Sequence, residues 1–377
     1  MAGEVLSDKQ IKRLIEGGAI LNADPNLINP SSLDLRISNE IWRTLGTVLP
    51  LPGQSIKQLL ESSKHLTQIP GLAIGEKIFL DKNQPYLFRI IEELNLPQGI
   101  SAKIFNKSSR GRVGISVKGL TNGNCCFDRI DNAYSGKIYA EICATSFSQI
   151  LCLGKTAIPQ IRFYNGMPQP IRGFDLSLLL KRESILLDKD NKPVEFSQAQ
   201  VDSICNSGMF TFTADLSGNF LVYRARKDNF PIDLEMENYY DSNDFFEEVK
   251  SIHGEKQILI HPGELVLIKS KEKIQIPPYL AAEIVEHSAE IGDIKCHYAG
   301  LINPGHGYSE NKNAATHIVF EVRARDMPIL IQHGQPLAKF ELYKMLEEPE
   351  IKYMTVKSTG FDSLPSILPK QFKKEEI

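Results

Sequence analysis

"KIFLDKNQPYLFRIIEELNLP" spans residues 77–97, and "QILIHPGELVLIKSKEKIQIP" spans residues 257–277. The two stretches align without a gap at an offset of 180 residues, and both end in the same proline. At the same offset, Glu141 falls on Glu321 further along the chain. A single offset shared by separate matches predicts an internal repeat, and a repeat of this length indicates two copies of one structural unit.

The local pattern in both copies is that of short β-strands. Runs rich in β-branched and aromatic residues, such as "KIYAEICA" (137–144), are separated by Gly, Pro, Asn and Asp, which is typical of a sandwich or barrel. A capping box at Ser7 predicts one short helix that ends near Gly17. We therefore expect a mainly β protein of two domains, 1–195 and 196–377, joined through the polar stretch 187–200.

Composition excludes several classes of protein. The chain of 377 residues carries 43 basic and 46 acidic side chains, so no excess of positive charge favours a nucleic-acid partner. No run of 18 apolar residues predicts a membrane span. The first residues are polar and unlike a signal peptide, and the six cysteines form no CxxC pair, so we expect reduced thiols and a cytoplasmic location.

The loop "NKSSRGRVGIS" (106–116) stands out from this balanced composition. It places three cations and two hydroxyls among glycines: Lys107, Arg110, Arg112, Ser108 and Ser109. Hydroxyls, backbone N–H groups and cations suit an anionic ligand such as a phosphate. A solvated hairpin tip with ordinary surface charges is the alternative interpretation.

The second copy has lost most of this chemistry. Lys107 falls on His287 and Arg112 on Gly292, whereas the flanking strand pattern survives and Ser108 falls on Ser288. A feature needed only for folding is expected in both copies. The loss therefore favours a functional role for the loop of the first copy.

Glu141 lies inside the apolar strand 137–144, on the face that it shares with Tyr139 and Cys143. A carboxylate on such a strand is costly unless it is paired, and a partly buried carboxylate near an arginine suits general acid–base chemistry. A structural ion pair between Glu and Arg is the alternative, and it is the preferred interpretation for Glu321.

Four stretches resemble conserved motifs of the dCTP deaminase family in the dUTPase-like superfamily. They are "LSDKQIKRLIEGGAI" (6–20), "SSLDLRIS" (31–38), "KSSRGRVG" (107–114) and "RIDNAYSGKIYAEI" (129–142). The resemblance covers residues 5–165 strongly and the second copy weakly. The length and the tandem arrangement are similar to the long form of this deaminase in proteobacteria.

The resemblance implies a fold and a reaction. Each domain is expected to be a dUTPase-like distorted β-barrel or jelly roll with a few short helices. Domains of this family assemble in trios with sites at subunit boundaries, so we expect a homo-oligomer, for which a trimer is one form. The implied reaction converts dCTP and water into dUTP and ammonia. The resemblance implies no zinc and no metal held by the protein's own residues, and the sequence agrees for zinc, because no HxE occurs with a PCxxC motif. Mg²⁺ is expected with the triphosphate.

The resemblance also implies a role for each site residue. Glu141 matches the catalytic carboxylate, which takes a proton from the water that attacks C4. Arg112 and Ser108 match residues that bind that water and orient the carboxylate. The substrate-binding positions are Lys107 and Ser109 for the triphosphate, Arg129 and Asp131 for sugar and base, and Tyr134 against deoxyribose. Arg110 replaces the leucine usual in the family and adds a further cation for the substrate.

Three alternatives remain at the level of sequence. "RIDNAYSGKI" also resembles a motif of dUTP pyrophosphatases, so a bifunctional deaminase–pyrophosphatase or a dUTPase is the nearest enzymatic alternative. A non-catalytic nucleotide-binding regulatory protein is the alternative of another class, since a fold does not guarantee activity. The stretch "YMTVKSTGFDS" (353–363) is a weak candidate for a segment that closes over the substrate.

Overall fold

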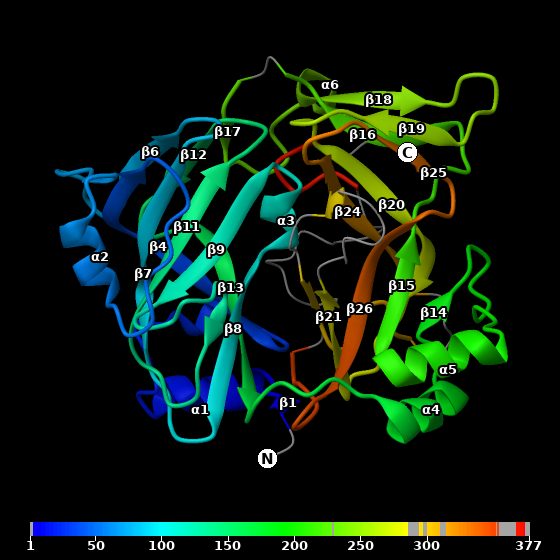
Figure 1. Ribbon diagram of the computed structural model, residues 1–377, viewed down its shortest axis with the longest axis horizontal. Helices are drawn as coiled ribbons and strands as arrows, with labels where there is room; N and C mark the ends of the chain where they lie inside the picture. The colour runs from blue at the N-terminus through cyan, green and yellow to red at the C-terminus, as the bar shows by residue number, and fades with distance from the viewer. Residues whose placement is uncertain are drawn as a thin grey trace. The chain divides into compact units, whose positions relative to one another are not determined.

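The computed structural model describes residues 3–227, 230–285, 294–296, 300–309, 314–351, 353 and 367–373. The chain divides into two compact units. The first consists of Met1–Pro168, Asn229–Tyr240 and Lys370–Ile377, and the second of Gln169–Asp228 and Asp241–Pro369. The expected mainly β fold with two tandem copies is confirmed (Figure 1).

The first unit is a curved sheet with short helices at its edges. Its helices are α1 (Asp8–Glu16), η1 (Pro25–Leu27), α2 (Ile56–Ser62) and α3 (Ser108–Gly111). Its strands are β1 (Glu4–Val5), β2 (Ile20–Leu21), β3 (Ile28–Asn29), β4 (Ser32–Thr44), β5 (Leu66–Gln68), β6 (Lys77–Leu80), β7 (Pro85–Asn95), β8 (Ile100–Asn106), β9 (Ile115–Thr121), β10 (Arg129–Ile130), β11 (Ser135–Ala144), β12 (Gln149–Cys152), β13 (Ala157–Asn165) and β17 (Ile232–Asp233).

Strand β4 gives the first unit its barrel-like curvature. Its first half pairs with β13, and its second half pairs with β7 after a register shift between Ile37 and Ile41. One strand thus joins the order β10-β8-β13-β4 to the order β4-β7-β11-β9. A strand that changes partners at an irregularity is how a sheet turns a corner and encloses a core.

The second unit repeats this plan with a divided strand. Its helices are α4 (Gly173–Arg182), α5 (Gln198–Ser207) and α6 (Ser242–Phe245). Its strands are β14 (Leu186–Leu187), β15 (Met209–Thr213), β16 (Phe220–Ala225), β18 (Phe246–Lys250), β19 (Gln257–Ile260), β20 (Val266–Ile274), β21 (Leu280–Val285), β22 (Ile294–Cys296), β23 (Leu301–Ile302), β24 (Thr316–Ala324), β25 (Ile329–Gln332) and β26 (Pro336–Lys344). β15 pairs with β26, and β16 pairs with β20. Two strands therefore make the two pairings that β4 makes alone in the first unit.

The predicted repeat is visible in the strand registers. Glu141 on β11 lies opposite Leu87 on β7, and Glu321 on β24 lies opposite Leu267 on β20. Both partners are therefore related by the same offset as the two glutamates. The β12–β6 and β25–β19 pairs match residue for residue at this offset as well.

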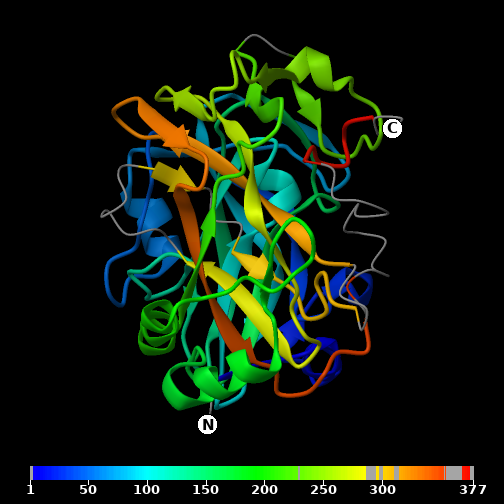
Figure 2. The same cartoon turned by 90° about the vertical axis from the view of Figure 1, so that its right-hand side faces the viewer.

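The division into units differs in detail from the predicted ranges 1–195 and 196–377. Residues 169–195 belong to the second unit, because α4 lies beside α5 (green in Figures 1 and 2) and β14 pairs with β20. A late segment, Asn229–Tyr240, belongs to the first unit, because β17 adds to β12 in parallel. Among the helices in the described part of the chain, none has the length and apolar content needed to cross a bilayer.

Candidate active site

Glu141 occupies the middle of β11, where both faces of the strand are covered. Its neighbours Ile138, Ala140 and Ile142 point into the core and are fully buried, and Glu141 itself is 5 % exposed. Its two carboxylate oxygens accept hydrogen bonds of 3.0 Å each, one from the Thr47 hydroxyl and one from the Val48 backbone N–H. A buried carboxylate held at both oxygens has a fixed orientation, which a positioned proton acceptor requires.

Lys118 supplies the positive charge beside this carboxylate. It lies on β9 directly opposite Glu141, and its ammonium is 3.6 Å from the carboxylate. The same ammonium donates to the Thr47 hydroxyl at 3.1 Å and lies 4.8 Å from the centre of the Phe127 ring. The cation is therefore held between a carboxylate, a hydroxyl and an aromatic face.

A small apolar cluster fixes the loop that contacts Glu141. Its buried members are Ile56, Leu87, Leu120 and Tyr139, and Trp42, Val48, Leu60 and Phe127 pack against them. The Val48 side chain packs in this cluster, and its backbone N–H donates to the Glu141 carboxylate. The packing of the residues between β4 and α2 thus determines how Glu141 is held.

The predicted anion-binding loop folds as one helical turn, α3, between β8 and β9. Arg110 and Arg112 are each 6 % exposed, whereas Ser108 and Ser109 are half-buried. Lys107 precedes the turn and pairs with the carboxylate of Asp34, which also accepts a 3.0 Å hydrogen bond from the Asn29 amide. Burial lowers the pKa of Lys107, and the charge of Asp34 acts against that shift.

In the described part of one chain, Ser108 and Arg112 lie at α3, beyond the end of β9 that leads away from Glu141. Ile115 pairs with Ala144 and Lys118 with Glu141, so Glu141 lies three residues along the strand from the start of β9. Three strand residues span roughly 10 Å, and α3 lies beyond that point. The described partners of the carboxylate come from Thr47, Val48 and Lys118 instead.

Arg129 lies on β10, and Asp131 and Tyr134 lie on the turn that joins β10 to β11. Arg129 donates to Asp131 at 2.8 Å, and both side chains are about half exposed, at 54 % and 56 %. The Tyr134 hydroxyl donates to the Lys137 carbonyl at 2.7 Å. Gly136 is required there, because a Cβ at that position would lie 2.9 Å from the Tyr134 hydroxyl oxygen. Two exposed charges and one half-buried ring are thus presented together.

Comparisons with known proteins identify the family of the chain. A family model described as the 2'-deoxycytidine 5'-triphosphate deaminase (DCD) N-terminal domain matches residues 2–167, and one described as the C-terminal domain matches residues 182–372. The chain belongs to the dCTP deaminase family. The expected resemblance is confirmed, and it extends over both copies.

Individual relatives and a solved structure match as well. The protein named "dCTP deaminase, dUMP-forming" from Dictyoglomus thermophilum is 28 % identical over 166 residues, covering 42 % of this chain and 79 % of that protein. The protein of the same name from Methanospirillum hungatei is 31 % identical over 164 residues, covering 42 % and 80 %. The crystal structure of the deaminase from Agrobacterium tumefaciens matches with a TM-score of 0.79 at 26 % identity, over 93 % of this chain and 100 % of that one.

Sequence reasoning missed three residues that contact Glu141. Lys118 had a signal, because a lysine in the apolar strand 115–121 invites a search for an opposing carboxylate. Thr47 and Val48 gave no such signal. Both are loop residues, and Glu141 lies 94 and 93 positions away from them, so no local pattern links them to it. His287, Ser288 and Gly292 lie outside the described residues, and so does the stretch 353–363 apart from Tyr353.

Proposed function

We propose that this member of the dCTP deaminase family hydrolyses the 4-amino group of dCTP at a site built around Glu141. The observation that carries the proposal is the environment of that carboxylate. It is 5 % exposed, fixed at both oxygens and paired with Lys118, inside the domain that the N-terminal family model matches. Burying a carboxylate on a strand is costly unless it is paired and hydrogen-bonded, and this one has three such partners.

Glu141 acts as the proton carrier in this mechanism. A carboxylate has about four acceptor positions, so it still accepts from water while Thr47 and Val48 occupy two of them. It takes a proton from the water as the oxygen adds to C4. It then gives the proton to the amino group, the C4–N bond breaks and ammonia leaves, and the second proton of the water passes to N3, which leaves a carbonyl at C4.

The turn around α3 and the turn before β11 hold the rest of the nucleotide. The Ser109 hydroxyl and backbone N–H groups bind phosphate oxygens. The Lys107 ammonium, which pairs with Asp34, also contacts the triphosphate and contributes positive charge there. Arg129 and Asp131 line sugar and base, and the Tyr134 ring packs against deoxyribose. The exposure of Arg129 and Asp131 supports this assignment, because both are open to a ligand.

Ser108 and Arg112 complete the site from a neighbouring subunit. Their distance from Glu141 along β9 within one chain supports this arrangement, as does the family's expected assembly in trios. We therefore propose a homo-oligomer, with a trimer as one form, in which α3 of one subunit faces β11 of the next. The cytoplasmic location and the absence of a nucleic-acid partner stay predictions.

Mg²⁺ enters with the substrate in this proposal. The described residues contain no group of three or more His, Cys, Asp or Glu side chains that can hold a metal ion. Mg²⁺ at nucleotide sites keeps several waters and uses phosphate oxygens, so the triphosphate itself provides the ligands that fit it. The ion neutralises phosphate charge, and the proton transfers above belong to the chain's own residues.

Product analysis tests the function. Purified protein is incubated with dCTP and Mg²⁺, and the nucleotides are separated by anion-exchange chromatography. Formation of dUTP with ammonia supports the deaminase, whereas dUMP with pyrophosphate moves the assignment to the bifunctional enzyme. If dCTP is untouched but dUTP is cleaved, the protein is a dUTPase. If neither nucleotide changes, both enzymatic assignments fail and a nucleotide-binding regulator takes their place.

A further inference from the structure

A segment from the second half of the sequence is built into the first unit. Residues 230–240, here called the strap, contain β17, which extends the β6–β12 sheet in parallel. The Ile232 N–H donates to the Ser148 carbonyl at 2.9 Å, and the Leu234 N–H donates to the Ile150 carbonyl at 3.1 Å. The strap therefore begins as a genuine strand of the first unit.

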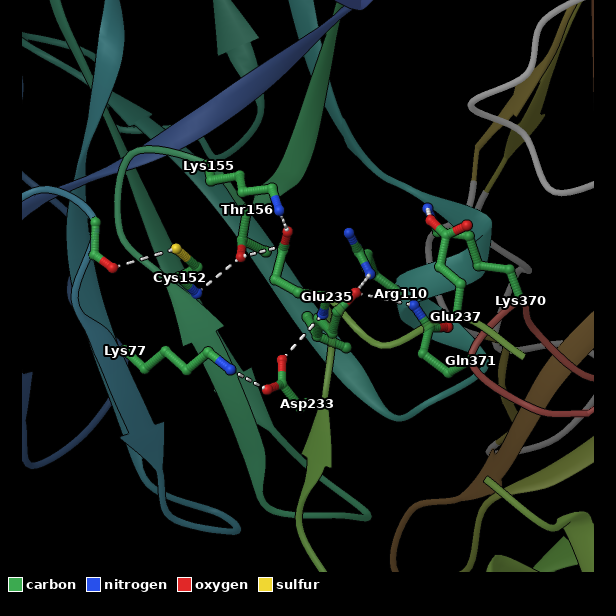
Figure 3. Close-up of polar contacts among 12 residues, drawn as sticks. Lys77, Arg110, Cys152, Lys155, Thr156, Asp233, Glu235, Glu237, Lys370 and Gln371 are labelled. Carbon is green, nitrogen blue, oxygen red and sulfur yellow. Dashed lines mark hydrogen bonds and ion pairs between the residues drawn. The ribbon is translucent and has the colours of Figure 1, made fainter. Parts of the chain in front are cut away.

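Acidic side chains on the strap match cations and a hydroxyl on the first unit (Figure 3). Asp233 accepts from the Lys77 ammonium at 2.6 Å. Glu235 accepts from the Thr156 hydroxyl at 2.8 Å, and its other oxygen lies 2.9 Å from the Lys155 ammonium. Backbone pairing sets the register of the strap against β12, and two ion pairs accompany it.

The last described residues of the chain hold the strap from its other side. The Asn238 N–H donates to the Lys370 carbonyl at 2.8 Å, and the Gln371 side chain donates to the Leu234 carbonyl at 3.2 Å. Gln371 is fully buried and Phe372 is 3 % exposed. Two distant segments therefore meet beside α3, where Ile232, Asp233 and Leu234 of the strap are buried together with Gln371 and Phe372.

Arg110 joins the strap to α3. Its Nε donates to the Ala157 carbonyl at 3.2 Å, and its Nη1 approaches the Leu234 carbonyl on the strap at 3.5 Å. Burial lowers the pKa of Arg110, and the negative charges of Glu235, Asp34 and Glu237 act in the opposite direction. Its position in Figure 3, turned toward Glu235 and Gln371, is that of a buried cation compensated by the strap.

The consequence for the site follows from the size of α3. A helix of one turn has almost no stability of its own, because helix nucleation is unfavourable. Its orientation depends on side chains that anchor it, and Arg110 provides such an anchor between Ser108 and Arg112. In the family motif this position is usually leucine. In this chain it is Arg110, and the strap carries the acidic residues Glu235 and Glu237 near it.

We propose that Arg110 is a positioning residue rather than a phosphate ligand, and that the strap sets the orientation of Ser108 and Arg112 through it. The inference rests on the proposed deaminase function of the same site. It assigns to the second half of the sequence a part in the activity of the first. Removing the anchor is expected to slow the chemical step and to leave substrate binding almost intact.

The test compares Arg110→Leu with the matched control Lys77→Met, which removes an ion pair of the same strap whose half-exposed lysine lies on β6 and not on α3. We expect Arg110→Leu to lower kcat roughly tenfold with KM for dCTP within about twofold of wild type. Lys77→Met keeps the wild-type kcat and KM. A rise in KM for Arg110→Leu with kcat unchanged, or no change in either, overturns the proposal.

A second variant keeps the test decisive if Arg110→Leu folds poorly. Glu235→Gln keeps the size of the side chain and removes the charge that faces Arg110. If Arg110 positions α3, Glu235→Gln lowers kcat. If Arg110 binds phosphate, removing a nearby negative charge lowers KM instead, which overturns the proposal.

Hydrogen exchange separates this inference from the proposed function. Amides of residues 232–234 and 108–112 are expected to exchange faster in Arg110→Leu than in wild type, whether or not the protein converts dCTP. Unchanged exchange in both segments means that Arg110 does not link them. If these amides exchange faster in Arg110→Leu but wild type does not convert dCTP, Arg110 still links the strap to α3. Only the deaminase assignment is then lost.

Discussion

Glu141 and Glu321 hold the same place in two copies of one fold, yet their surroundings differ. Both lie on a central strand opposite a leucine, at the shared offset, and they are 5 % and 1 % exposed. Around Glu141 the chain adds Thr47, Val48 and Lys118. At the same offset Lys118 falls on Tyr298 and Arg112 on Gly292.

The fold accepts a buried glutamate at this position in both copies, so its presence alone is compatible with a structural role. At the shared offset the sequence changes at Lys107, Arg112 and Lys118. We therefore expect that a buried carboxylate on this strand does not make a site by itself. The function is expected to depend on those residues, and the predictions below test that dependence.

The largest effect is expected from the two glutamates themselves. Glu141→Gln keeps the shape of the side chain but cannot accept a proton, so kcat for dCTP should fall by roughly a thousandfold, as for loss of a general base. Glu321→Gln should keep kcat within about twofold of wild type. Steady-state ammonia release measures both. Equal losses in the two variants would show that the copies share the chemistry.

Mixing two inactive variants tests where Arg112 acts. Glu141→Gln and Arg112→Ala should each be nearly inactive alone. If α3 of one subunit completes the site of another, co-refolded mixtures regain a clear fraction of wild-type activity, because some sites combine an intact Glu141 with an intact Arg112. The second copy cannot supply the arginine, since it carries Gly292. Mixtures that stay inactive would place both residues in one chain's own site.

The fold was predictable because its signals are local or repeat. Period-2 strands such as 137–144, the capping box at Ser7 and the offset between copies each appear directly in the sequence, and the structure confirms α1, β11 and the repeat. The position of Glu141 on a buried strand followed from the same pattern.

The rest depends on contacts that no local pattern encodes. Lys107 pairs with Asp34, which is 73 positions away, although each residue lies in a recognisable motif. The strap comes from the second half of the sequence but contributes a strand to the first unit. That strand has two residues, which is too short for any periodicity. The loop with Thr47 and Val48 is held at Glu141 by its packing in the apolar cluster with Ile56 of α2. Such contacts follow from tertiary structure.

Lys118 should have a smaller effect than Glu141. It is 26 % exposed, and removing a partly exposed ion pair typically costs about 1 kcal/mol, so Lys118→Gln should lower kcat roughly fivefold. Lys118→Arg keeps the charge opposite Glu141 and should retain most of the activity. Saturating dCTP assays measure both variants. A Lys118→Gln enzyme as fast as wild type would show that Thr47 and Val48 suffice to hold the carboxylate.

The smallest effect concerns stability and is confined to the first copy. Burial raises the pKa of Asp128 to about 7, and the Gly119 N–H and the charge of Lys118 oppose the shift. The offset places Tyr308 at the matching position, so the second copy lacks this group. Unfolded aspartate titrates near pH 4, so between about pH 4 and 7 the folded state holds a proton that the unfolded state has released. Stability of the first copy should therefore fall as pH rises through this window.

Trp42, the single tryptophan of the chain, lies on β4 and reports on the first copy alone. Its fluorescence is followed during urea unfolding at pH 5 and pH 8 for wild type and Asp128→Asn. Asparagine tolerates the positive φ of 64° at this position and still accepts from the Gly119 N–H, so the variant should fold. The midpoint should drop more between the two pH values in wild type than in the variant. An equal drop in both would mean that other groups, shared by the two proteins, carry the pH dependence of this copy.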